Sequence, residues 1–145
     1  MADRATVTRN ALARLIGLLT RSHLSDGEAL VIPQCRSIHT IGMRFPIDVA
    51  FVKTLEPSRY PEAWPSGQVA KWPKNVLPRP VSSGETLVEV IAVVQAIRPG
   101  RLAGARGADT AIELPSGKLA ATATSVGHRL AWGKETRITA DRERG

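Results

Sequence analysis

The stretch HTIGMRFPIDVAF, residues 39–51, decides the fold. Its large apolar side chains occupy the odd positions from Ile41 to Phe51, while Arg44, Pro46 and Asp48 occupy even positions. Alternation with a period of two is typical of a β-strand that buries one face. Because Pro46 has no N–H to donate to a strand ladder, we expect this strand to be broken between residues 42 and 46 or to lie at a sheet edge.

The segments around this stretch favour a β-rich fold. TLVEVIAVVQAI, residues 86–97, is apolar on both sides near its centre, which predicts an interior strand. Shorter strands are expected within 29–32, 109–117 and 128–132. Two helices are predicted: an amphipathic one over Thr8 to Ser22, from the spacing of its leucines, and a short one within 118–127.

A proline-rich stretch separates the two halves of the sequence. Residues 55–85 hold six of the ten prolines and two of the three tryptophans, without a regular period. Proline is poorly tolerated inside a strand ladder, so we expect an irregular insertion loop within a single domain that spans residues 1–145. Such a long loop is either a surface ornament or a lid over a ligand.

Composition limits the possible functions. The 145 residues include 20 Lys and Arg against 13 Asp and Glu, so the surface is basic and attracts anions. The charges are scattered and the sequence has only six aromatic residues, so a platform for nucleic acid is not expected. The sequence shows no signal peptide and no apolar run of membrane-spanning length, and we expect a soluble, cytoplasmic protein with no membrane span.

Three segments together resemble a known family. GLLTRSHLSDGEALVI, CRSIHTIGMRFPIDVAFV and LAGARGADTAIELPSG, in this order, are similar to the prokaryotic family called domain of unknown function 192. The resemblance covers residues 5–55 and 86–132. It implies a mainly β domain, a sandwich or a jelly-roll-like barrel, with one N-terminal helix and a short C-terminal helix. It brings no assigned activity, catalytic residues or cofactor.

This chain departs from the family pattern at three places. Related sequences join the FPIDVAF strand to the next one by a short turn, where this chain has residues 55–85. They often carry Pro-Trp-Arg where this chain has Pro99, Gly100 and Arg101. They tend to have Gly-Asp where this chain has Gly127 and His128, so a site that used that aspartate is in doubt here.

Six charged residues, chosen for their chemistry, define a candidate ligand-binding set. Its members are Arg21, His39, Arg44, Asp48, Arg101 and Glu113. In an enzyme, Asp48 or Glu113 would act as general base with His39, and the arginines would hold an anionic group. In a structural role, the Asp48 carboxylate would instead accept bonds from main-chain amides or pair with an arginine.

Two classes of function therefore remain open. The first, which we favour, is a non-catalytic β-rich module that binds a small polar or anionic ligand or a protein partner. The second is a small hydrolase-like enzyme that uses Asp48 or Glu113 with His39. The three histidines and the single cysteine have no metal-ligand spacing, and no phosphate-binding or dinucleotide-binding motif occurs, so neither a metal nor a cofactor is expected.

Overall fold

The computed structural model describes residues 2, 4–7, 18–55, 86–132 and 138–140. This part of the chain is mainly β, as the sequence predicted. Its strands, in chain order, are β1 (Arg4–Val7), β2 (Glu28–Pro33), β3 (Ser37–His39), β4 (Ile47–Thr54), β5 (Thr86–Ile97), β6 (Leu102–Gly104), β7 (Thr110–Pro115), β8 (Arg129–Trp132) and β9 (Ile138–Ala140). The one helix within these residues is α2 (Lys118–Ala121), the short helix that the sequence predicted near the C-terminus.

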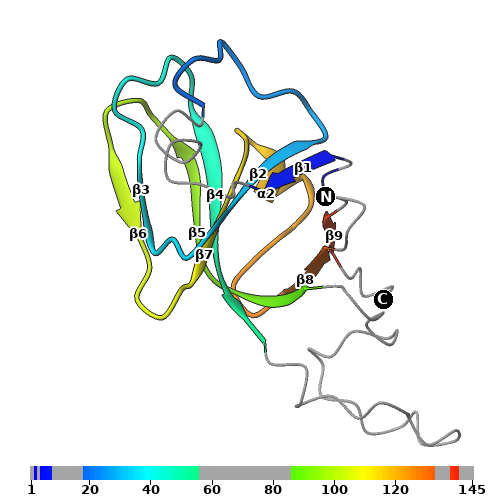
Figure 1. Ribbon diagram of the computed structural model, residues 1–145. Coiled ribbons are helices and arrows are strands. Elements are labelled where there is room, and N and C mark those ends of the chain that lie inside the picture. Colours follow the sequence, from blue (N-terminus) through cyan, green and yellow to red (C-terminus); the bar gives the residue numbers. More distant parts are fainter. Residues whose placement is uncertain (1, 3, 8–17, 56–85, 133–137, 141–145) are drawn as a thin grey trace, which may run out of the picture.

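Seven strands form one curled sheet in the order β1-β2-β7-β4-β5-β8-β9 (Figure 1). The β1–β2 pair is parallel, and every other neighbouring pair is antiparallel. The two edges approach each other, because Ala2 exchanges both backbone hydrogen bonds with Ile138 of β9, at 3.2 and 3.0 Å. The sheet is therefore a half-barrel with its edges linked at one point, and a sandwich of two facing sheets is not confirmed.

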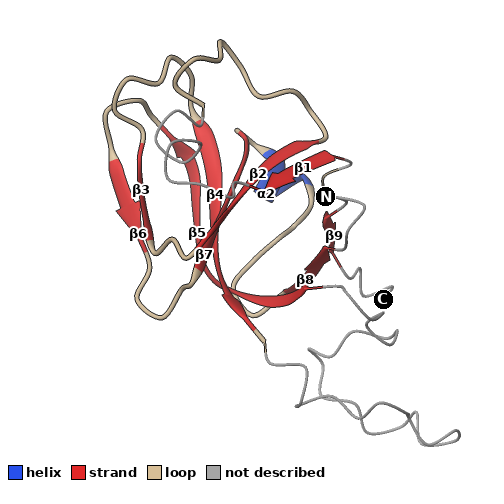
Figure 2. Ribbon diagram, viewed as in Figure 1, coloured by secondary structure: helices blue, strands red, loops and turns tan. Residues whose placement is uncertain are grey.

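Strands β3 and β6 form a separate two-stranded antiparallel sheet beside the half-barrel (Figure 2). Ile38 of β3 is buried, while its neighbours Ser37 and His39 are exposed. Gly104 of β6 lies so close to the start of β3 that an added Cβ would meet the Arg36 carbonyl oxygen at 3.0 Å and the Ser37 Cβ at 3.1 Å, so any other residue would push the two chains apart. The small sheet thus packs one face against the half-barrel and leaves the other face open.

Apolar side chains cover both faces of the curled sheet. The inner core lies inside the curve and includes Ala50, Val52, Val88, Val90, Ile112, Leu114, Leu119 and Leu130. The outer core lies between the convex face, the loop before β2 and the small sheet, and includes Leu18, Leu24, Ile38, Met43, Ile47, Val49, Phe51 and Ala111. Alternate residues of β4 enter the two cores, so this strand is buried on both sides.

The opening stretch behaves mostly as predicted, with corrections at its start. Met43, Ile47, Val49 and Phe51 are buried, and the interruption before Pro46 is a turn between β3 and β4. Ile41 lies in that turn and is exposed, because the chain reverses there instead of continuing as a strand. The even positions of β4 are buried as well, so the alternation separates two cores and not core from solvent.

The predicted N-terminal helix, Thr8 to Ser22, falls mainly outside the described residues. Its last part is described, and there the prediction of helix is wrong. Residues 18–20 form a turn, which the Arg21 N–H closes by donating to the Leu18 carbonyl at 3.1 Å. Leu18 is buried in the outer core, and Leu19 packs against it and lies beside Gly42. The proline-rich insertion is likewise outside the described residues, apart from Leu55.

The strand predicted over residues 86–97 is confirmed, but only its first part is interior, because β8 pairs with residues 86–89 alone and residues 91–94 are half-buried. Strand β5 lies between β4 and β8, with Val88 and Val90 fully buried. Its register against β4 shifts between Ile47 and Val49, opposite Ala96, whose φ is +50°. This irregularity is a β-bulge, which bends and twists a strand. Within the described residues no helix has the length and apolar character needed to cross a bilayer.

Thr40 joins the small sheet to the turn that follows β5. Its hydroxyl donates to the Arg98 carbonyl at 2.6 Å and accepts from the Arg101 N–H at 2.9 Å. Its own carbonyl accepts from the Gly100 N–H at 2.9 Å, and the residue is fully buried. Thr40 therefore makes hydrogen bonds with most of the backbone N–H and C=O groups of the 98–101 turn.

We predict that Thr40→Val destabilises the protein by about 1 to 3 kcal/mol, because valine keeps the shape but leaves a buried carbonyl and amide without their partner. Thr20→Val is the matched control, since Thr20 is exposed in a turn. Urea unfolding of both variants measures the difference. Equal stability of the two variants would contradict the role given to Thr40.

Candidate functional site

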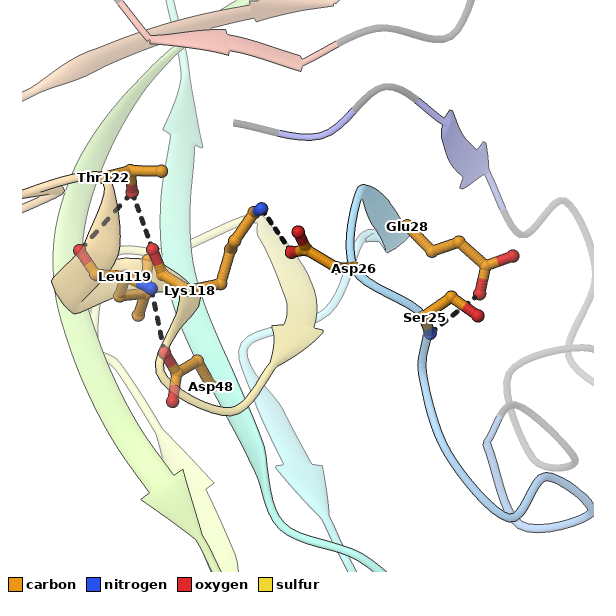
Figure 3. Close-up of polar contacts among 7 residues, drawn as sticks. All are labelled: Ser25, Asp26, Glu28, Asp48, Lys118, Leu119 and Thr122. Carbon is orange, nitrogen blue, oxygen red and sulfur yellow. Dashed lines mark hydrogen bonds and ion pairs between the residues drawn. The ribbon is translucent and has the colours of Figure 1, made fainter.

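The Asp48 carboxylate is buried and bonded to two main-chain amides, of which Figure 3 draws the one that belongs to Leu119. Its Oδ1 accepts from the Ala96 N–H of the β5 bulge at 2.8 Å, and its Oδ2 accepts from the Leu119 N–H of α2 at 2.9 Å. The side chain has no exposed surface. Asp48 therefore connects β4, β5 and α2, and neither oxygen faces solvent.

Asp48 also takes the place of a helix cap for α2. Gly117 is at the N-cap position and has no side chain to accept from the first amides of the helix. The carboxylate at the Leu119 N–H supplies that acceptor. At the same end, Lys118 forms an ion pair with Asp26 in the turn before β2, and this lysine lowers the pKa of the exposed Asp26 carboxyl (Figure 3).

Glu113 lies on the other face of the sheet. In the register of β4 with β7, Asp48 is opposite Leu114 of the inner core, whereas Glu113 is opposite Val49 of the outer core. Glu113 is 6% exposed, and burial raises the pKa of its carboxyl from 4.5 to about 7. The sheet itself thus separates the two carboxyl groups, which cannot act on one substrate atom.

The remaining candidates lie at the surface. His39 is exposed on the open face of β3, and within the described residues it makes no hydrogen bond or ion pair with Asp48 or Glu113. Arg21 pairs with Glu28 at 3.1 Å, with both side chains partly exposed. Arg44 and Arg101 are exposed in the turns at either side of Thr40. The structure thus places His39, Arg44 and Arg101 around the small sheet, and gives Arg21 a carboxylate partner.

A serine–histidine pair, which the sequence did not single out, occurs before β8. Ser125 Oγ lies 3.2 Å from His128 Nε2, and the Ser125 N–H donates to His128 Nδ1 at 3.4 Å. Either atom of the Oγ–Nε2 contact can be the donor, depending on the tautomer of His128. Both contacts lie within residues 125–128, where the His128 N–H also donates to the Ser125 carbonyl at 3.2 Å, so the pair closes the turn before β8.

In the described part of the chain, six exposed basic residues lie on the small sheet and its turns and form a basic face. We define this basic face by six exposed residues: Arg36, His39, Arg44, Arg98, Arg101 and Arg106. Segments 34–47 and 95–108, which build it, contain no Asp or Glu. Within the described chain none of the six forms an ion pair. The five guanidinium groups are therefore free to bind an anion from outside.

Half of the basic face was missed by the sequence analysis. Arg36, Arg98 and Arg106 become neighbours of the predicted candidates only through the pairing of β3 with β6, which joins residues 37–39 to residues 102–104. The absence of acidic residues from both segments was a signal in the sequence that could have identified them. For metals, no group of three His, Cys, Asp or Glu side chains in the described part of the chain comes together as a ligand set.

The resemblance to an uncharacterised family is confirmed over the first part of the chain. The profile of domain of unknown function 192, described as "Uncharacterized ACR", matches residues 2–57. The match ends where the proline-rich insertion begins. No curated protein matches the sequence.

Two solved structures share the fold at low sequence identity. A protein of unknown function from Novosphingobium aromaticivorans has 16% identity and a TM-score of 0.58, over 88% of this chain and 73% of that chain. A proposed transcription regulator from Sinorhizobium meliloti has 12% identity and a TM-score of 0.60, over 90% of this chain and 81% of that one. At these identities the similarity concerns the fold alone.

We predict that Asp48→Asn lowers the free energy of unfolding by about 1 to 3 kcal/mol. Asparagine keeps the shape but presents an NH₂ group to one of the two amides that now donate to the carboxylate. Asp26→Asn is the matched control, because its carboxylate is 86% exposed and a surface pair contributes little. Denaturant unfolding compares the two variants, and an Asp48→Asn protein as stable as the parent would remove the architectural role.

We predict that Glu113 makes stability depend on pH. Because folding raises its pKa from 4.5 to about 7, the folded protein binds more protons than the unfolded chain between these values. The free energy of unfolding therefore falls as pH rises through this window, by an amount on the order of 3 kcal/mol, and levels off above it. Glu113→Gln should remove this slope in thermal or urea unfolding across pH 4 to 8. The same slope in both proteins would assign it to other groups.

Proposed function

We propose that the protein is a non-catalytic β-rich module that binds an anionic group, on a small ligand or on a partner protein, through the basic face. The observation that carries the proposal is the set of five exposed arginines and one histidine, with no carboxylate in the same segments and no ion pair within the described chain. Like charges gathered on one surface repel one another, and a bound anion relieves this repulsion.

The choice of arginine supports recognition of a defined anion. All five strong cations of the basic face are arginines, although the sequence also contains lysines, such as Lys53 and Lys118. The guanidinium group presents a planar fork of donors that fits carboxylate or phosphate oxygens two at a time, whereas lysine acts as a point charge. The Thr40 bonds fix the backbone on which Arg98 and Arg101 stand, so these donors are anchored on an ordered turn.

The hydrolytic alternative has less support from the geometry. Both Asp48 oxygens are occupied by main-chain amides in the interior. Glu113 has the raised pKa of a general acid or base, but Leu30 and Val49 flank it in the neighbouring strands, and His39 lies on the exposed face of another sheet. A binding role for His39, Arg44 and Arg101 uses side chains that solvent already reaches.

The proposal predicts binding of small polyanions that depends on the arginines. Tripolyphosphate and citrate are titrated into the protein by calorimetry at low salt. Combined Arg44→Gln and Arg101→Gln substitutions should weaken binding at least about fivefold, because two charge-assisted donors are lost. Lys53→Gln is the control, since it removes one positive charge from an exposed position of β4 outside the basic face.

Measurements at several salt concentrations distinguish binding at the basic face from a general attraction of anions to a positively charged protein. Binding at the basic face should weaken as ionic strength rises, while the ratio between the parent and the arginine variant persists. If Lys53→Gln weakened binding as much as the arginine substitutions, or if neither anion bound to the parent, the proposed function would be refuted.

A further inference from the structure

The basic face includes an apolar patch, which consists of Leu102 and Ile41. Leu102 of β6 is 78% exposed and Ile41, in the turn after β3, is 57% exposed. In the described chain Val126 is the one other large aliphatic residue with comparable exposure, and it lies in the turn before β8. Single exposed apolar residues are common on protein surfaces, but two of these three lie on the small sheet and its turns, where the arginines also lie.

Backbone pairing places these two residues at the same end of the small sheet. Leu102 is directly opposite His39 in the β3–β6 ladder, so both side chains point to the open face of the small sheet. Ile41 follows Thr40, whose carbonyl and N–H bond the Gly100 N–H and the Arg101 carbonyl on the other strand. Leu102 and Ile41 thus stand at the same end of the ladder as Arg98 and Arg101.

We propose that the basic face binds an extended acidic segment of a partner protein, in which a bulky aliphatic side chain covers Leu102 and Ile41 and flanking carboxylates pair with the arginines. This inference rests on the proposed function and specifies its ligand. The ladder of three residue pairs spans about 10 Å, the length of three residues of an extended peptide. Arg36 and Arg106 lie beyond one end of the ladder, and Arg98 and Arg101 lie next to Leu102 beyond the other end, so the arginines match carboxylates on either side of an apolar residue.

Charge and composition favour a peptide over other anionic partners. A protein interface combines an apolar centre with a polar rim and is enriched in arginine and depleted in lysine, which is the composition found here. Single-stranded nucleic acid requires aromatic side chains on which bases stack, and a membrane surface favours tryptophan and tyrosine at the interface. Segments 34–47 and 95–108 contain one residue of these kinds, Phe45, which is half-buried against the outer core.

Two fluorescein-labelled peptides test the inference on the full chain. Asp-Glu-Leu-Glu-Asp supplies both the charges and the aliphatic side chain, and Asp-Glu-Gly-Glu-Asp supplies the charges alone. Fluorescence anisotropy should show binding of the leucine peptide about tenfold more tightly than the glycine peptide, because one leucine side chain is removed from water. A labelled oligothymidylate and phosphatidylserine vesicles are measured alongside.

Matched variants test whether the apolar patch causes the preference for the leucine peptide over the glycine peptide. Leu102→Ser should reduce the leucine preference to about twofold or less while leaving the affinity for the glycine peptide unchanged. Val126→Ser removes an equally exposed aliphatic side chain elsewhere and should leave the preference intact. Both side chains lie at the surface, so thermal unfolding should be the same as for the parent.

The outcomes separate this inference from the proposed function. Equal affinity for the two peptides, with tripolyphosphate and citrate still bound through the arginines, overturns the acidic segment and leaves the anion-binding function standing. Tighter binding of the oligothymidylate or of the vesicles than of the leucine peptide also overturns it. If neither the peptides nor the small anions bind, both proposals fall.

Discussion

The buried carboxylate of Asp48 is the contact on which the arrangement of the half-barrel depends. It is bonded to the bulge of β5 on one side and to the first turn of α2 on the other. A bulge leaves unpaired backbone, and here the Ala96 N–H at the bulge is paired by the Asp48 carboxylate. The bend that this bulge gives to β5 lets the sheet curl round α2, whose Leu119 fills part of the inner core (Figure 1).

Because both oxygens of the Asp48 carboxylate accept from main-chain amides, we do not place the function in the interior of the half-barrel. The inner core is formed by branched aliphatic residues, and its one described acid is occupied by amides. The second buried acid, Glu113, lies among apolar residues of the outer core. Charged groups available to a ligand are found instead on the small sheet, where Thr40 stabilises the turns from which the arginines extend.

Local patterns in the sequence predicted the strands well but not their surroundings. The apolar run of 86–97 and the alternation up to Phe51 both reflect burial that each strand imposes on its own residues. Alternation could not show that β4 is buried on both faces. Its even positions include the polar Asp48 and Thr54 beside Ala50 and Val52, and this mixture does not predict a second core. Leu19, the last residue of the helical pattern and the one that is described, lies in a turn and packs against the outer core, since tertiary contacts outweigh helix propensity.

The candidate site was predictable only in part, for a similar reason. His39, Arg44 and Arg101 could be named because they lie in distinctive segments, but Arg36, Arg98 and Arg106 join them through a strand pairing that links distant parts of the chain. Likewise, the sequence suggested amides or an arginine as partners of Asp48, and only the fold shows that the amides belong to Ala96 and Leu119.

The 99–101 corner illustrates how one departure from the family pattern alters this surface. Related sequences often have tryptophan where this chain has Gly100, whose φ of +77° is strained for any other residue. Its N–H donates to Thr40, and an added Cβ there would meet no atom within 4 Å, so the glycine serves the turn and not a tight packing contact. A tryptophan at this corner would require a different turn and would place a ring beside Arg98 and Arg101, suited to stacking. With glycine, the guanidinium groups and the Leu102 side chain stay uncovered, which favours carboxylates and an aliphatic group over a flat aromatic ligand.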